Sequence, residues 1–387
     1  MRRRQFLTLS AVGLGSMLVA PNILLANVES DRRFVFIIQR GAADGLSVVV
    51  PHGDPAYRAL RGGFAIEDAI DLDGMFGLHP ALTTLGDLYL GQQALFVHAV
   101  ASPYRERSHF DGQNVLESGG SRPYELREGW LNRLIRTLPQ SSGEAIAFAP
   151  TIPMALRGAA EVASFAPSSL PDAPDDLVMR VGRLYESDPQ LHSLWSAAME
   201  AEALGSQEAA RNGAASAGRT AARFLVEPDG PRIAMIETSG WDTHSNQRNR
   251  LNNQLKALDT LIGALRDGLG DAWRHTTVLV ATEFGRTAAI NGTGGTDHGT
   301  ASAALLAGGA VRGGRVLANW PGVGAGELYQ DRDLAPTLDL DALIAVTAAE
   351  TFGLDPQEAM AILFPGGRFD PAISGIIHGS STDRSPG

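Results

Sequence analysis

The chain has 387 residues, of which 44% are hydrophobic and 19% charged, a composition typical of a globular protein with a large core. Its 32 basic and 43 acidic residues give a net charge of -11, which argues against a nucleic-acid-binding surface. The sequence contains no cysteine, so disulfides, cysteine catalysis and cysteine metal ligands are all excluded.

The first 30 residues have the pattern of an export signal. A basic start is followed by an apolar stretch over 7–20 and by small residues near Ala26. The sequence RRQFL at 3–7 resembles the twin-arginine class, whose pathway carries folded proteins. The apolar stretch is shorter than the roughly 20 residues of a membrane helix, so we expect signal cleavage, a periplasmic or secreted protein and no stable membrane span. An uncleaved anchor is the alternative, because Leu24 interrupts the usual small-residue cleavage site.

Beyond this signal, apolar runs alternate with helical patterns. Strands are predicted at 34–38, 94–99, 233–236, 277–281 and 303–307. The first run is too continuously apolar for a half-exposed strand, which favours a central parallel strand. Leucine and isoleucine recur at helical spacing over 249–269. The alternation predicts an α/β fold with a mostly parallel central sheet and helices on both faces.

One α/β domain is expected to span residues 31–378. Within it, a connection rich in Pro and Ser at 164–174 precedes an Ala-rich helical sequence at 176–223. We interpret this region, about 165–225, as a helical insertion packed on one side of the domain. Residues 379–387 form a polar tail.

Polar residues follow the predicted strands, at the edge where open α/β sheets usually bind ligands. Asp44 stands among glycines after the first strand and is either a turn residue or a functional group. Ser108 follows the second strand, just before a helical pattern. It is either an N-cap or a nucleophile placed where a helix start favours an anion. His109 and Asp111 follow directly, a denser polar group than a cap requires.

Carboxylates and imidazoles recur after the third and fourth strands. The residues are Asp242, His244, Glu283, Asp297 and His298, and Arg286 lies in the same region. Asp242 and His244 are two apart, so in an extended segment both side chains point the same way and can reach one cation, a simple surface pair being the alternative. The sequence TVLVATEFGRT at 277–287 carries a carboxylate directly to the end of a buried strand. Together these residues predict a metal site of the kind that binds Zn, Mn and similar ions.

Six stretches, taken in order, resemble the signatures of uncharacterised-domain family 1501: QRGAADGL, RSHFDGQNVLESG, GWDTH, TEFGRT, GGTDHGTA and RDLAPTLDLDALIAVTAAETFGLDP. That family is similar to sulfatases of the alkaline-phosphatase superfamily, which implies an alkaline-phosphatase-like fold. By this resemblance Ser108 would be the nucleophile. The metal ligands would include Asp44, Asp242, His244 and His298.

In that superfamily a buried strand typically ends in Asp-His-Gly, which supplies one ligand to each of two metals. TEFG stands at this position, with Glu283 for the Asp and Phe284 for the His. An apolar ring cannot bind a metal, so a nitrogen ligand is lost unless His109, Asp297 or another group replaces it. Arg286 would hold a sulfate or phosphate oxygen with its planar guanidinium.

The resemblance implies an exported hydrolase of small anionic esters, either sulfates or phosphates, with Ser108, His109 and Arg286 as its catalytic residues. Its cofactor would be one or two divalent ions, Zn or Mn, with Ca and Mg as further candidates. No Cys/Ser-x-Pro-x-Arg motif surrounds Ser108, which argues against a formylglycine sulfatase. The alternative is a scaffold that has lost hydrolysis, as Phe284 would allow, and that binds an envelope protein.

Overall fold

The computed structural model describes residues 31–139, 145–166 and 213–379, with a few further residues between 181 and 195. The predicted export signal, most of the predicted insertion and nearly all of the predicted tail lie outside these residues, so they stay predictions. Within the described ranges, no helix is long and apolar enough to cross a membrane.

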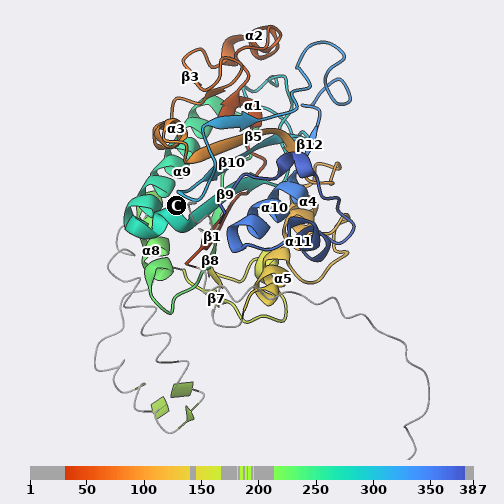
Figure 1. The fold of residues 1–387 in the computed structure, drawn as a ribbon. Coiled ribbons are helices and arrows are strands. Elements are labelled where there is room, and N and C mark those ends of the chain that lie inside the picture. The colour runs from red at the N-terminus through yellow and green to blue at the C-terminus, as the bar shows by residue number, and fades with distance from the viewer. Residues whose placement is uncertain are drawn as a thin grey trace, which may run out of the picture.

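A nine-stranded sheet runs through the middle of the molecule (Figure 1). Its strands are β1 (Arg33–Gln39), β5 (Ala94–Ala101), β6 (Ala145–Phe148), β7 (Ala163–Ser164), β8 (Ile233–Thr238), β9 (Thr276–Thr282), β10 (Ser302–Ala307), β11 (Arg315–Leu317) and β12 (Leu338–Asp339). Their order is β11-β5-β10-β9-β1-β8-β6-β7, and β12 also pairs with β5. All pairs are parallel except those of β10, which is antiparallel to β5 and β9. The five predicted strands and the mostly parallel sheet are confirmed.

A small sheet and the helices complete the described fold. The small sheet has the order β2-β4-β3, with β2 at Val49–Val50, β3 at Ile70–Asp71 and β4 at Gly77–Leu78. The helices are α1 (Gly45–Val48), α2 (Tyr57–Arg61), α3 (Thr83–Leu90), α4 (His109–Ser118), α5 (Trp130–Thr137), α8 (Ala214–Val226), α9 (Gln247–Leu269), α10 (Leu340–Phe352) and α11 (Pro356–Leu363). The helix predicted over 249–269 is α9, which begins two residues earlier.

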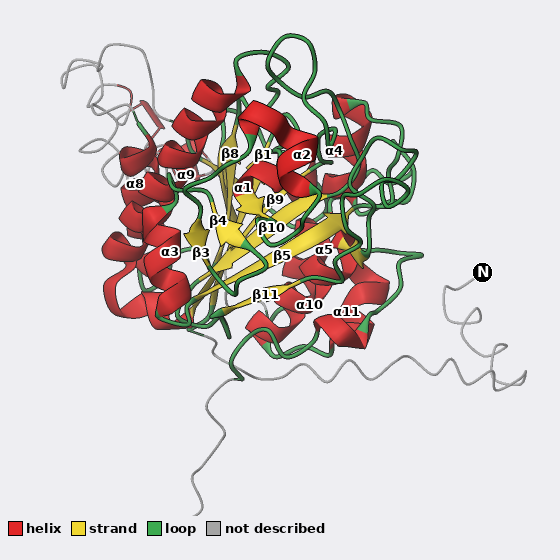
Figure 2. Cartoon of the chain, turned by 90° about the horizontal axis from the view of Figure 1, so that it is seen from above, coloured by secondary structure: helices red, strands yellow, loops and turns green. Residues whose placement is uncertain are grey.

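Helices cover both faces of the large sheet (Figure 2). α3, α8 and α9 lie on one face, whereas α5, α10 and α11 lie on the other. The sequence of β1 explains why both faces are covered, since every residue of this strand is buried. Phe34, Phe36 and Ile38 belong to one hydrophobic core, and Val35 and Ile37 belong to the other. A strand that is apolar on both sides can be stable only between two layers of helices.

The carboxyl ends of β1, β5, β8 and β9 lie at one edge of the sheet, because these four strands run in the same direction. β10 runs the opposite way, so the residues just before it reach this edge. The connection 283–301 therefore leaves β9 and enters β10 at the same place. This arrangement brings the predicted polar loops together.

Candidate metal centre

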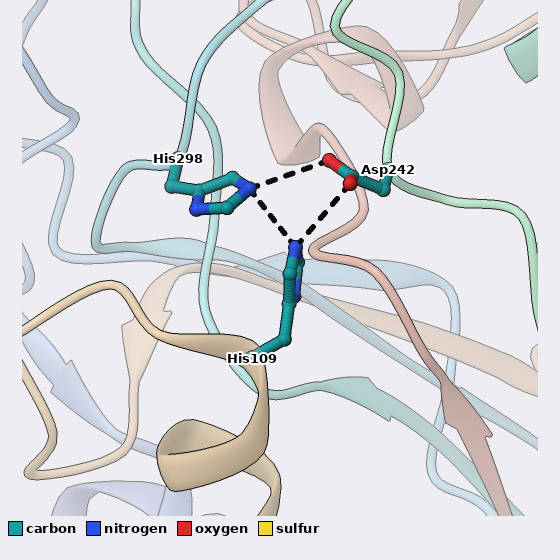
Figure 3. Close-up of side chains that lie close together, drawn as sticks. All are labelled: His109, Asp242 and His298. Carbon is teal, nitrogen blue, oxygen red and sulfur yellow. Dashed lines mark hydrogen bonds and ion pairs between the residues drawn. The ribbon is translucent and has the colours of Figure 1, made fainter.

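Three side chains from three separate segments of the chain converge at this edge (Figure 3). They are His109, the first residue of α4, Asp242, in the loop after β8, and His298, shortly before β10. His109 Nε2 lies 2.9 Å from His298 Nε2 and 3.6 Å from Asp242 Oδ2. His298 Nε2 lies 3.4 Å from Asp242 Oδ1. One ligand atom from each residue thus lies within 4.8 Å of the other two.

His244 adds another imidazole from the loop after β8. Its Nε2 lies 3.0 Å from His298 Nε2 and 2.9 Å from Asp242 Oδ1. Tetrahedral ligands at ordinary zinc bond lengths would be about 3.4 Å apart. His109, Asp242 and His298 thus form a compact set of ligand atoms, and His244 lies beside two of its members, His298 and Asp242.

Each of these imidazoles is held through its Nδ1 atom. The pairs are His109 with Glu283 Oε1 at 2.8 Å, His244 with Asp297 Oδ1 at 3.0 Å, and His298 with the Arg107 carbonyl oxygen at 2.9 Å. A carboxylate or carbonyl oxygen can only accept, so the proton of each ring must lie on Nδ1. In the neutral rings, the lone pair of each Nε2 therefore points into the cluster.

This arrangement of ring nitrogens suits a bound cation. When these rings are neutral, Nε2 lone pairs only 2.9–3.0 Å apart cannot hydrogen-bond to one another, and a bound cation would turn their repulsion into attraction. Histidine ligands of metals usually donate their other ring N–H to a carboxylate or a backbone carbonyl, as these rings do. Imidazole and carboxylate are ligands that suit Zn or Mn. The residues present therefore fit the divalent metal that the sequence predicts.

Glu283, predicted as a ligand, lies behind His109. Its Oε1 accepts hydrogen bonds from His109, Gln113 and the Gly41 N–H, and its Oε2 accepts one from Thr282. Burial opposes the charge of Glu283, but the bonds from His109 and Gln113 lower its pKa below the ordinary value. Its bond to His109 in turn raises the pKa of that imidazole. The structure thus gives Glu283 the role of orienting a ligand, because its oxygens are already taken.

Arg286, predicted to hold a substrate anion, is buried and bonded within the protein. Its Nη1 donates to Asp242 Oδ1 at 2.7 Å, and its Nε donates to Thr296 Oγ1 at 3.1 Å. Its Nη2 donates to the Thr296 carbonyl. Burial opposes ionisation of Asp242, but the bond from Arg286 lowers the pKa of that carboxyl. The structure therefore assigns Arg286 to Asp242 rather than to a substrate oxygen.

Asp44 makes an ion pair and does not join the cluster. Its two oxygens accept from Arg61 at 2.7 and 2.8 Å, and both side chains are buried. Ser47 and Gln247 donate to the same carboxylate. The sequence allowed Asp44 two roles, a turn residue or a metal ligand, and the structure shows neither. It is half of a buried ion pair, whose disruption would leave an uncompensated charge.

The family of the chain follows from its sequence. A family model described as "Protein of unknown function (DUF1501)" matches residues 94–363, which include His109, Asp242 and His298. The chain belongs to the DUF1501 family. The comparison with curated proteins gave no match.

Solved structures similar to this DUF1501 protein share little sequence with it. The structure described as Ps i-CgsB in complex with k-i-k-neocarrahexaose is 12% identical, with 86% of this chain and 74% of that chain covered and a TM-score of 0.43. The C-terminal periplasmic domain of EcEptC from Escherichia coli, in complex with Zn, is 9% identical, with 72% and 73% covered and a TM-score of 0.38. A protein in the alkaline phosphatase superfamily from Vibrio parahaemolyticus is 14% identical, with 72% and 60% covered and a TM-score of 0.34. These TM-scores lie below 0.5, so the chemistry of this DUF1501 protein has to be inferred from its own site.

Phe284 of this DUF1501 protein forms an apolar wall beside the imidazoles. Its ring is stacked on that of His109, with centroids 5.0 Å apart, and lies 5.4 Å from that of His298. It is buried in a small apolar cluster that includes Tyr104. Gly112 of α4 makes room for it, because a Cβ at that position would lie 2.9 Å from the Phe284 ring. The resemblance implies that Phe284 leaves the site without one nitrogen ligand. In the structure the imidazole of His109 packs on Phe284 and brings a ring nitrogen to the cluster.

Ser108, the predicted nucleophile, lies between two residues that contact His298. The Arg107 carbonyl accepts from His298 Nδ1, and His109 Nε2 faces His298 Nε2. Ser108 occupies the N-cap position of α4, but its side chain makes no capping hydrogen bond. Its backbone N–H donates to the Tyr104 hydroxyl at 3.1 Å. The serine therefore stands at a helix start without capping the helix.

Two further residues support the cluster without being predicted from the sequence. Gln113 donates to Glu283 at 3.0 Å and accepts from Arg40 at 2.8 Å, which fixes the carboxylate behind His109. Asn291 donates to Asp297 Oδ1 at 3.1 Å. Gln113 lies one helical turn after His109, a spacing that places both on one face of α4 and could have suggested it. No comparable sequence signal marks Asn291.

Proposed function

We propose that this protein is a metal-dependent hydrolase of sulfate or phosphate esters. The observation that carries the proposal is the cluster of His109, Asp242 and His298 with His244 beside it, in which each imidazole is hydrogen-bonded through Nδ1 and turns its Nε2 toward the Asp242 carboxylate. His109, His244, His298 and Asp242 would hold one Zn or Mn ion. When bound, the ion would supply Lewis-acid stabilisation of the negative charge on the ester's oxygens.

The residues around this site divide into ligand supports and a nucleophile. Glu283 and Arg286 keep His109 and Asp242 in place from the buried side. Ser108 stands at the start of α4, where the helix dipole and the free N–H groups favour an anion. Its hydroxyl would attack phosphorus or sulfur, releasing the alcohol of the ester, and water would then hydrolyse the ester formed on Ser108.

The second candidate is a scaffold that binds an envelope protein and has lost hydrolysis. Phe284 is the feature that favours it, because this residue cannot be a ligand. The position of His109 favours the hydrolase, since an imidazole nitrogen is present in the cluster despite Phe284. A scaffold also has no need of three imidazoles whose protons are all directed away from one point.

Purified protein should hydrolyse at least one ester in a panel of aryl sulfates, phosphomonoesters and phosphodiesters. We expect activity to disappear after chelation and to return with Zn²⁺ or Mn²⁺, because the imidazole nitrogens need a cation to act together. Elemental analysis of protein purified without chelator should find close to one ion per chain. Stoichiometric metal without any hydrolysis would favour the binding scaffold, and absence of both would overturn the metal centre.

Export by the twin-arginine pathway belongs to the same proposal and rests on Arg3 and Arg4. Exchange of both residues for Lys should leave uncleaved precursor in the cytoplasm, because that pathway depends on the arginine pair. Cell fractionation with an antibody to the protein measures the result. Normal processing and export of the double variant would show that another route is used.

A further inference from the structure

The turn 329–333 lies against the metal cluster and has no role in the proposed chemistry so far. It includes Arg332 and Asp333, the first residues of the last family-like stretch of the sequence. Arg332 Nη2 donates to the backbone oxygen of His298 at 2.8 Å. The Arg332 carbonyl accepts from the N–H of Ala288, in the connection that leads to His298, at 3.0 Å. The turn is therefore tied to the ligand loop through backbone and side chain.

Arg107 joins the other side of His298 to the same turn. Its carbonyl oxygen accepts from His298 Nδ1 at 2.9 Å. Its guanidinium contacts Asp333 Oδ2 through Nε at 2.9 Å and through Nη2 at 2.7 Å. These contacts form a closed ring around His298. The His298 imidazole bonds to Arg107, and Arg107 bonds to Asp333. Arg332, the neighbour of Asp333, bonds back to the His298 backbone.

The backbone of Arg107 adopts a strained conformation within this ring of contacts. Its φ is 61°, in the left-handed region that residues other than glycine seldom adopt. Such strain persists only where surrounding contacts hold it, and it is common at functional sites. Here Asp333, whose side chain is fully buried, holds the guanidinium of Arg107. The held side chain keeps the carbonyl of the same residue directed at His298.

We propose that Asp333 and Arg107 are positioning residues that fix the orientation and the Nδ1–H form of His298, and through it the metal affinity of the site. The proposal rests on the metal centre proposed above and assigns a role to the Arg332-Asp333 pair. Supporting residues of this kind typically change metal affinity by about 10- to 100-fold when they are replaced. Neither Asp333 nor Arg107 is a ligand, since each acts through the ring of His298.

Asp333→Asn removes the charge that holds Arg107 while keeping the size of the side chain. We expect it to weaken Zn²⁺ binding by about 10- to 100-fold in a chelator competition. Asp331→Asn is the matched control, since Asp331 is exposed in the same turn and Asn tolerates its φ of 53°. The control should bind Zn²⁺ like the unchanged protein. Asp333→Glu, which restores the charge, should recover part of the affinity.

A second measurement separates positioning from a general loss of structure. Nitrogen NMR of the metal-free protein should show His298 protonated on Nδ1, and a mixture of both neutral forms in Asp333→Asn. If that variant fails to fold, Arg107→Gly tests the same ring, because glycine tolerates the left-handed backbone while the guanidinium is lost with the rest of the side chain. Unchanged Zn²⁺ affinity together with an unchanged His298 proton position in the folded variant would overturn the proposal. The proton position on His298 can be measured whether or not the protein hydrolyses esters. The inference can therefore be tested even if the proposed hydrolase activity is absent.

Discussion

Replacement of Ser108 by Ala is expected to abolish ester hydrolysis and to leave the metal content unchanged. The reason is that Ser108 would form the covalent ester, whereas the cation would be held by His109, His244, His298 and Asp242. Loss of a nucleophile commonly lowers kcat by roughly 10³-fold or more. Steady-state kinetics with the best ester of the panel, together with elemental analysis, would measure both quantities.

Ser121→Ala is the control for this experiment, because Ser121 is exposed and bonded only to the nearby Glu125. It should keep the kcat and the metal content of the unchanged protein. If Ser108→Ala keeps its activity, the attacking group would be water or His109, and the covalent mechanism would have to be abandoned.

Replacement of His298 by Ala is expected to remove both metal and activity. His298 Nε2 lies within 3.4 Å of the facing atoms of His109, His244 and Asp242, so it is the central member of the cluster. Loss of this ligand should weaken metal binding by at least about 100-fold, the upper end of the effect of a supporting residue. Chelator competition and hydrolysis of the best ester would measure the two losses.

His52→Ala is the matched control, because His52 is partly exposed and pairs with Asp71, in the small sheet. It should keep metal and activity. A His298→Ala protein that binds one ion with unchanged affinity would contradict the metal centre. If it bound metal normally but hydrolysed nothing, His298 would instead act on the substrate.

The sequence predicted the fold because the sheet depends on local patterns. Runs such as Phe34 to Ile38 are apolar at every position, and only a strand between two layers can bury them. The convergence of Asp242 and His298 was predictable for the same reason, since ligands gather where strands end. The antiparallel direction of β10 could not be predicted, because an apolar run has the same pattern in both strand directions.

The roles within the site were harder to predict, because they depend on partners that are distant in sequence. Glu283 and Arg286 are chemically able to bind a metal and an anion, but each is buried against another side chain of the cluster. Asp44 pairs with Arg61, 17 residues away, and no periodic pattern connects the two. His109 was predicted as a catalytic residue, or as a replacement for the missing nitrogen ligand, and its place in the cluster follows from the direction in which α4 begins. The residue types predicted a cluster of carboxylates and imidazoles. Burial and hydrogen-bond partners determined which of these residues face the cluster and which support it from behind.

The antiparallel course of β10 also brings the two ends of the connection 283–301 together. Its two arms pair with each other, as the Gly285 N–H donates to the Thr300 carbonyl and the Gly299 N–H to the Gly285 carbonyl, both at 2.8 Å. A Cβ on Gly285 would lie 1.8 Å from the backbone of Ala301, so the arms can approach only with glycine there. The same connection carries Glu283, which bonds to His109, and Arg286, which bonds to Asp242. Exchange of this loop would therefore remove His298 together with the groups that hold the other two residues, so protein engineers would have to transplant all three segments of the cluster together.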